Sequence, residues 1–148
     1  ECIVHGPLEL MITEYCPVGS VLHRGKLFTR CEKACAASND SFVLRDRLNL
    51  DFPVATDQHC RMHLFNSKDL CLYEDLPALI KPGPLVLRLE LKIHPAAQIA
   101  YICKSYHTAI RNIEQDRWNR AGAENVVNEL IKYSGCGITK GHYFRGVD

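Results

Sequence analysis

Residues 13–66 hold four of the chain's eight cysteines and show no sustained helical period. The four are Cys16, Cys31, Cys35 and Cys60, and they lie among Gly, Pro, Asn, Asp and basic residues. An irregular segment of about 50 residues is uncommon inside a compact domain unless something else orders it. A metal centre bound by thiols would do so. We therefore predict that residues 13–66 are a cysteine-rich, cluster-binding insertion.

The spacing of these cysteines bears on which metal they bind. Three residues separate Cys31 from Cys35, whereas fourteen residues separate Cys16 from Cys31 and twenty-four separate Cys35 from Cys60. Structural zinc sites usually supply two close pairs, but an iron–sulfur cluster accepts four dispersed thiolates. The spacing favours an iron–sulfur cluster, with zinc and unligated thiols as the alternatives. Nearby basic residues would stabilise thiolates: Arg24, Lys26, Arg30, Lys33 and Arg61.

Other roles for the cysteines and their neighbours are open. Eight cysteines could form disulfides, but a hydrophobic content of 47% and long amphipathic segments are unlike a small secreted disulfide scaffold. His59 or His63 could replace a thiolate beside Cys60, although four cysteines already suffice. We expect Cys71 and Cys103 to be small core residues on helices, as free cysteines commonly are.

The rest of the chain alternates between strand and helix patterns. Residues 1–12 predict two short extended pieces broken by Gly6 and Pro7, and a helical turn capped by Asn66 or Ser67 is expected next. Leucines alternate along residues 85–92, which predicts a strand. Apolar residues then recur at helical spacing, which predicts helices over residues 95–113 and 124–133. This order is typical of a parallel α/β architecture.

Charge and hydropathy exclude some classes of protein. The net charge is only +1, so no acidic partner is indicated by the whole-chain field. No apolar run reaches the 18 or so residues that span a bilayer. We expect a cytoplasmic chain with no membrane partner. The chain opens at Glu1 inside a hydrophobic stretch, and we therefore expect it to be the C-terminal piece of a larger protein.

Three stretches of the chain resemble a known family. HGPLELMITEYC, DQHCRMHLFNSKDLCLYEDLPALI and TKGHYFRGV are similar to the C-terminal half of the collagenase-like peptidase family of unassigned mechanism, peptidase family U32. The resemblance implies a TIM-like barrel whose cysteine-rich insertion holds a four-iron, four-sulfur (4Fe-4S) cluster. Its ligands here would be Cys16, Cys31, Cys35 and Cys60. Many relatives have a further cysteine where this chain has Glu9, which bears on the ligand set.

The fold expected from the resemblance is α/β. Residues 1–148 would form a single partial domain, the C-terminal fragment of a TIM-like (β/α) barrel whose N-terminal portion is missing. Residues 13–66 would be the insertion, and residues 67–148 would form the strand–helix end of the barrel and the tail. Active sites of such barrels lie at the C-terminal ends of their strands.

Three residues outside the insertion are candidate catalytic groups. If the leucine face of residues 85–92 meets the helices, Arg88 and Glu90 face the barrel lumen or its mouth. The alternative is an ordinary ion pair between them. His5 ends the first predicted strand and could contact substrate on the same face, although a lone histidine there is more often structural.

The function remains open between three classes. The resemblance includes relatives that hydroxylate transfer RNA, ribosomal RNA or a ubiquinone precursor without molecular oxygen, so oxygen-independent hydroxylation of an RNA base is the first hypothesis. Basic residues between Arg24 and Arg61, with Phe28 and Phe42, could contact RNA. A collagenase-like peptidase is the second, although the chain lacks His-Glu-x-x-His and Gly-x-Ser-x-Gly motifs. A non-catalytic, cluster-stabilised scaffold or gene fragment is the third.

Overall fold

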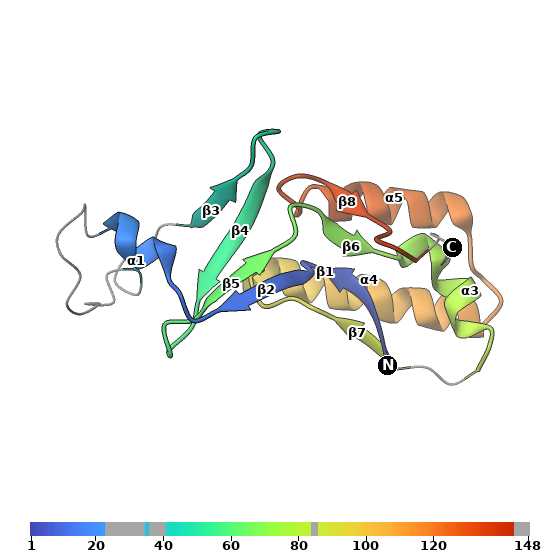
Figure 1. The fold of residues 1–148 in the computed structure, drawn as a ribbon. Coiled ribbons are helices and arrows are strands. Elements are labelled where there is room, and N and C mark those ends of the chain that lie inside the picture. The colour runs from blue at the N-terminus through green and yellow to red at the C-terminus, as the bar shows by residue number, and fades with distance from the viewer. Residues whose placement is uncertain (23–34, 36–40, 84–85, 144–148) are drawn as a thin grey trace, which may run out of the picture. The chain divides into compact units, whose positions relative to one another are not determined.

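The computed structural model describes residues 1–22, 35, 41–83 and 86–143 and divides the chain into two compact units (Figure 1). Unit 1 combines Glu1–Leu8 with Lys68–Asp148, and unit 2 is Glu9–Ser67. Each unit contains one four-stranded sheet. The α/β class predicted from the sequence is confirmed. No closed barrel is present among the described residues, and the barrel origin of the fold stays a prediction.

Unit 1 is built on a mixed sheet with the strand order β7-β1-β6-β8. β1 pairs in parallel with β7 and antiparallel with β6, and β6 pairs in parallel with β8. Because of these directions, the C-terminal ends of β1 and β7 lie at the same end of the sheet as the N-terminal ends of β6 and β8. The strands are β1 (Cys2–Gly6), β6 (Asp69–Cys71), β7 (Leu87–Leu89) and β8 (Ile138–Thr139).

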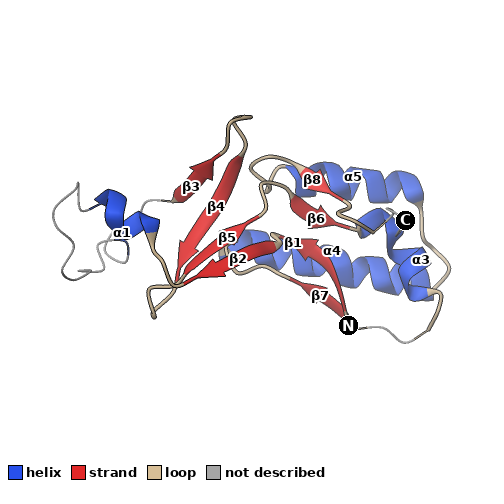
Figure 2. Ribbon diagram, viewed as in Figure 1, coloured by secondary structure: helices blue, strands red, loops and turns tan. Residues whose placement is uncertain are grey.

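Two long helices of unit 1 share one apolar core with this sheet (Figure 2). They are α4 (Ala96–Glu114) and α5 (Arg120–Ile131), and both predicted helices are thereby confirmed. Pro95 precedes α4 in an extended conformation, and the side chain of Asn119 caps α5 by accepting a hydrogen bond from the Ala121 amide. A 3-10 turn η1 (Tyr73–Asp75) and a short helix α3 (Leu76–Ile80) follow β6.

A single apolar cluster forms the core of unit 1. Leu72, Leu76 and Ile102 are completely inaccessible to solvent, and Leu130 of α5 is 2% exposed. Complete burial of each such side chain stabilises the fold by roughly 1.5–3 kcal/mol. Leucines at 87, 89 and 91 pack against the cluster, so the leucine face of the predicted strand points to the core.

Two local predictions in unit 1 were wrong. The segment after Ser67 forms strand β6 rather than a capped helical turn, because Asp69, Leu70 and Cys71 pair with β1 and β8 on both sides. Tertiary pairing overrides the capping signal there. Cys71 is buried as predicted but on a strand, whereas Cys103 is exposed on α4.

The described residues of unit 2 form an antiparallel sheet with the strand order β2-β5-β4-β3 and include the short helix α1 (Pro17–Leu22). The segment predicted to lack regular structure, residues 13–66, therefore contains three strands and the last residue of a fourth. Few of their residues are fully buried, so no alternating apolar pattern marked them in the sequence. The strands are β2 (Glu9–Thr13), β3 (Phe42–Arg45), β4 (Asp51–Thr56) and β5 (Met62–Phe65).

No helix in the described part of the chain is both long and apolar enough to cross a membrane.

Candidate metal centre

The turn between β4 and β5 places Cys60 and is organised by Asp57. One carboxylate oxygen, Oδ1, accepts hydrogen bonds from the backbone amides of His59 (2.9 Å) and Arg61 (3.0 Å). The other, Oδ2, accepts from the Arg61 Nε at 2.8 Å, and the Asp57 carbonyl accepts from the Cys60 amide at 3.0 Å. Desolvation acts to raise the pKa of Asp57, but these bonds together hold it well below its usual range. The turn is therefore fixed by an ionised carboxylate.

Cys60 itself has an unusual backbone conformation. Its φ angle is +63°, in the left-handed region that glycine occupies most readily. The other described non-glycine residues with positive φ are Asn49 and Asp116, whose side chains tolerate this region better. A cysteine there costs of order 1–3 kcal/mol, and such costs are concentrated at functional sites. The thiol is thus held at a position where glycine would be favoured if only the turn mattered.

A histidine bridges two carboxylates beside this turn. The Nδ1 atom of His63 contacts Glu9 Oε1, and its Nε2 atom lies 3.4 Å from Asp57 Oδ2. Both ring nitrogens of His63 therefore face carboxylate oxygens. His63 is occupied by these contacts rather than presented as a metal ligand.

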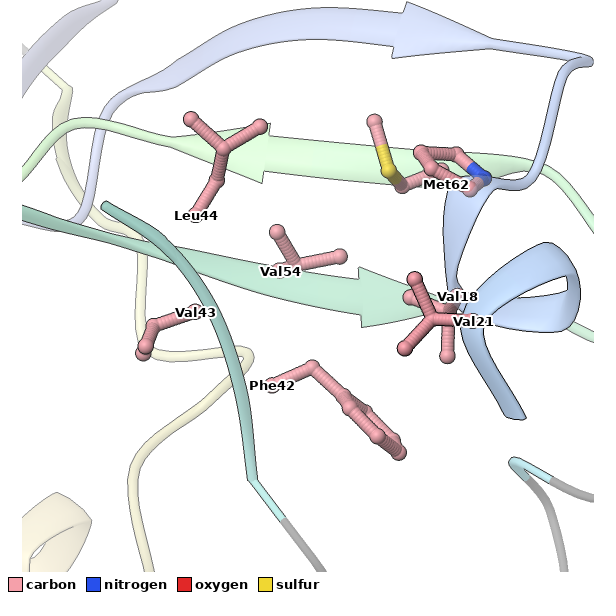
Figure 3. A pocket seen from close by; sticks show the side chains of 8 residues that line it. Val18, Val21, Phe42, Val43, Leu44, Val54 and Met62 are labelled. Carbon is pink, nitrogen blue, oxygen red and sulfur yellow. The ribbon is translucent and has the colours of Figure 1, made fainter. Parts of the chain in front are cut away.

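An apolar pocket of about 240 Å³ lies on unit 2 (Figure 3). Its lining comes from α1, β3, β4 and β5, and it includes Pro17, the residue directly after Cys16. Apolar surroundings exclude solvent and thereby tune the potential of a nearby redox centre. The other lining residues are Val18, Val21, Phe42, Val43, Leu44, Val54 and Met62.

The candidate residues in unit 1 are fixed by other contacts. His5 is 2% exposed, and burial, with a smaller effect of His94, lowers its pKa from 6.5 to about 4. Arg88 forms ion pairs with Glu90 and with Glu1 (3.1 Å), so the ordinary ion pair considered for these residues is present. Catalytic roles for His5, Arg88 and Glu90 stay predictions.

The comparison with known families decides the classification. A sequence model described as peptidase family U32 matches residues 1–148. The chain belongs to peptidase family U32. No curated protein and no solved structure matches it significantly. Membership confirms the resemblance found in the sequence, whereas neither a hydroxylase nor a peptidase activity follows from it alone.

The structure describes three of the four cysteines that the family resemblance offers as ligands. Cys16, Cys35 and Cys60 are free, partly buried thiols of unit 2. Cys31 lies outside the described residues, as do Arg24, Lys26, Arg30 and Lys33. Within the described ranges, no three His, Cys, Asp or Glu side chains are arranged to hold a metal ion. The donor chemistry nevertheless fits a cluster, because free thiols are the ligands that iron–sulfur clusters use.

The sequence analysis did not identify the polar residues that support the turn between β4 and β5, which carries Cys60. Asp57 carries a local signal, since an aspartate commonly bonds to backbone amides two residues further along the chain. The contact between Glu9 and His63 spans 54 residues and had no local signal. Glu9 stands where the family resemblance places a cysteine in many relatives. In this chain it has a structural role, because its carboxylate contacts His63 across the β2–β5 pair.

Proposed function

We propose that this chain is the cluster-binding part of an iron–sulfur member of peptidase family U32 that hydroxylates an RNA base without molecular oxygen. The ligands are Cys16, Cys31, Cys35 and Cys60, and the cofactor is a 4Fe-4S cluster, with zinc as the alternative metal. The observation that carries the metal site is Cys60, a partly buried thiol in a left-handed conformation that a dedicated hydrogen-bonded turn maintains.

The residues around Cys60 suit a ligand loop. Ionised Asp57 ties down the two amides on either side of the Cys60 amide, so the thiol is presented by a rigid backbone. Arg61 is held by the same carboxylate at 2.7 Å and keeps a positive charge next to the thiol in sequence. This positive charge would offset part of the negative charge of a thiolate-bound cluster. When bound, the cluster would supply a one-electron redox centre.

The choice of reaction rests on the family resemblance. Replacing a C–H bond by C–OH with water as the oxygen source releases two protons and two electrons, so a two-electron acceptor must take part. A cluster would relay these two electrons one at a time to that separate acceptor, whereas hydrolysis of a peptide needs no electron acceptor. Arg61 and Phe42 belong to the basic and aromatic residues considered for RNA contact, and the Arg61 side chain is 45% exposed.

Peptide hydrolysis is the second candidate because the family description contains it. A cysteine peptidase needs an activated thiolate next to a histidine. Cys71 is in register with His5 across the β1–β6 pair, but its thiol is buried and burial raises its pKa. Its sulfur lies 3.9 Å from the Tyr106 hydroxyl. Such a thiol is protonated at neutral pH and is a poor nucleophile.

The test compares nucleosides from anaerobically grown cells of the source organism with and without the gene. Total transfer and ribosomal RNA are digested and analysed by mass spectrometry. We expect one nucleoside heavier by a single oxygen atom in cells with the gene or the Cys103→Ser variant, and its absence in cells with Cys60→Ser. Identical nucleoside profiles in all four strains would contradict the hydroxylase. Peptide cleavage by the purified Cys60→Ser protein would instead establish the hydrolase.

A further inference from the structure

The register of the unit 2 sheet brings two of the proposed ligands to the same end of that sheet. β2 and β5 are antiparallel, and at one end of this pair Thr13 is in register with Met62. Cys16 follows Thr13 by three residues, and Cys60 precedes Met62 by two. The C-terminal end of one antiparallel strand lies beside the N-terminal end of its neighbour. Both cysteines therefore lie beyond the end where β2 stops and β5 starts (Figure 1).

An irregularity in β2 turns Glu9 toward the face of the sheet that holds His63. Ile12 is in register with His63, so a regular ladder would place Glu9, three residues earlier, on the opposite face. The register shifts between Glu9 and Met11, however, and Glu9 is in register with Phe65 instead. Phe65 and His63 share one face of β5, so Glu9 lies diagonal to His63 and within reach of it. Bulges of this kind commonly re-aim a side chain next to a functional site.

His63 connects Glu9 to the carboxylate that holds the Cys60 turn. Its Nδ1 contacts Glu9 Oε1, and its Nε2 lies 3.4 Å from Asp57 Oδ2. Oδ2 also accepts a hydrogen bond from Arg61 Nε at 2.8 Å, so this oxygen is held from two sides while Oδ1 faces the amides of the turn. The His63, Asp57 and Glu9 side chains are 19%, 22% and 25% exposed. Solvent therefore screens these contacts less than it would at the open surface.

We propose that Glu9 and His63 are positioning residues for the ligand Cys60, an inference that rests on the proposed function. Through Asp57 they hold the turn that presents the Cys60 thiol, and through β2 they hold it beside the strand that leads to Cys16. Neither residue itself binds the cluster. Polar partners that orient metal ligands in this way typically contribute roughly 10–100-fold to metal affinity.

The test compares apolar variants of both residues with a matched variant at the other end of the same sheet. Glu9→Met and His63→Leu remove the polar atoms and keep much of the side-chain volume. Arg45→Met breaks the ion pair between Arg45 and Asp51 (2.6 Å), which joins β3 to β4 at the end of β4 remote from the Cys60 turn. Each full-length variant and the double variant are purified anaerobically. Iron and sulfide content, the rate of iron loss to a chelator and the electron paramagnetic resonance spectrum of the reduced cluster are measured.

We expect Glu9→Met and His63→Leu to contain the wild-type amount of iron and sulfide and to lose iron roughly tenfold faster. The double variant should lose it no faster than His63→Leu, because both residues act through one chain of contacts. The spectrum of the reduced cluster should change in both single variants and stay that of the wild type in Arg45→Met. Glu9→Gln should lose iron more slowly than Glu9→Met, because its amide can pair with His63 Nδ1 as donor or acceptor.

Three results would overturn the positioning role while leaving the cluster itself established. They are iron loss at the wild-type rate in both single variants, equal acceleration in Arg45→Met, and additive acceleration in the double variant. Wild-type protein without iron and sulfide would instead contradict the proposed function, and the positioning role with it. Each single variant decides the outcome by itself if another fails to fold.

Discussion

The two units of this chain differ in how their structures are held together. Among its described residues, unit 1 encloses a continuous cluster of twelve buried residues, from Val4 to Leu130. In unit 2 the described buried hydrophobic residues are Val18, Met62 and Phe65. Of the twelve large hydrophobic side chains that are exposed among the described residues, eight belong to unit 2, including Val21 (74%) and Leu48 (71%).

This contrast teaches that apolar burial explains unit 1 but not unit 2. A small unit without an adequate core usually relies on disulfides, metals or a partner. Cys16, Cys35 and Cys60 form no disulfide with one another, so such bonds do not supply the missing stability. A thiolate-bound cluster would cross-link unit 2 and contribute its binding energy to folding. If the proposed cluster is bound, the cysteines that predict its chemistry would also contribute to the stability of their unit.

Removal of the metal should have the largest effect, and only on unit 2. Treating the anaerobically purified protein with a chelator and ferricyanide should expose residues 9–67 to proteolysis while leaving residues 68–143 protected. The fragments are identified by mass spectrometry after brief digestion. If both units became sensitive together, or neither did, the contrast in how they are stabilised would be wrong.

A substitution in the apolar core should destabilise unit 1, whereas removal of the metal should not. Leu72→Ala removes a fully buried side chain and should lower the free energy of unfolding of unit 1 by about 3 kcal/mol. Leu48→Ala in unit 2 removes a side chain that is 71% exposed and should change stability by less than about 0.5 kcal/mol. Denaturant titration measures both. A larger loss for Leu48→Ala would show that Leu48 is covered in the folded protein.

Acidification should weaken unit 1 through His5. Its pKa is about 4 in the folded chain and 6.5 in the unfolded chain, so the folded state binds fewer protons between these values. The contribution of His5 to the free energy of unfolding is therefore fully present above pH 6.5 and decreases as the pH drops. It levels off below pH 4, with a total loss of roughly 3 kcal/mol. Denaturation at a series of pH values measures this slope. His5→Asn should abolish it, and an unchanged slope in that variant would assign the effect elsewhere.

The smallest effect is expected at Arg88. Its guanidinium is exposed and pairs with Glu1 and Glu90 at the surface of unit 1. Exposed ion pairs contribute little because solvent and salt screen them. Arg88→Met should leave the denaturation midpoint within experimental error. If the variant is also fully active in the nucleoside assay, the predicted catalytic role of Arg88 is wrong, and a loss of activity at unchanged stability would establish it.

The sequence predicted unit 1 better than unit 2 for a physical reason. Helices α4 and α5 repeat apolar residues at helical spacing because one face of each is buried. Strands β3 and β4 are barely buried, so their residues carry no alternation that distinguishes them from a loop. Burial creates the sequence patterns on which such predictions depend.

The candidate sites were predictable only in part. Cysteines and the HG pair are conspicuous by residue type, so Cys60 and His5 were identified as candidates. The partners that determine their behaviour are distant in sequence, as with Tyr106 beside His5 and Glu9 beside His63. Pairings of this kind are set by the fold, and a single sequence gives no local signal for them.

The central claim is that thiols of unit 2 bind an iron–sulfur cluster, and the most direct measurement is metal and sulfide content. Wild type, Cys60→Ser and the exposed-cysteine control Cys103→Ser are purified anaerobically, and iron, zinc, acid-labile sulfide and visible absorption are determined for each. We predict iron and sulfide in equal amounts with broad absorption near roughly 400 nm in wild type and control, and their loss in Cys60→Ser. Colourless protein containing zinc, or iron and sulfide retained in Cys60→Ser, would contradict the account.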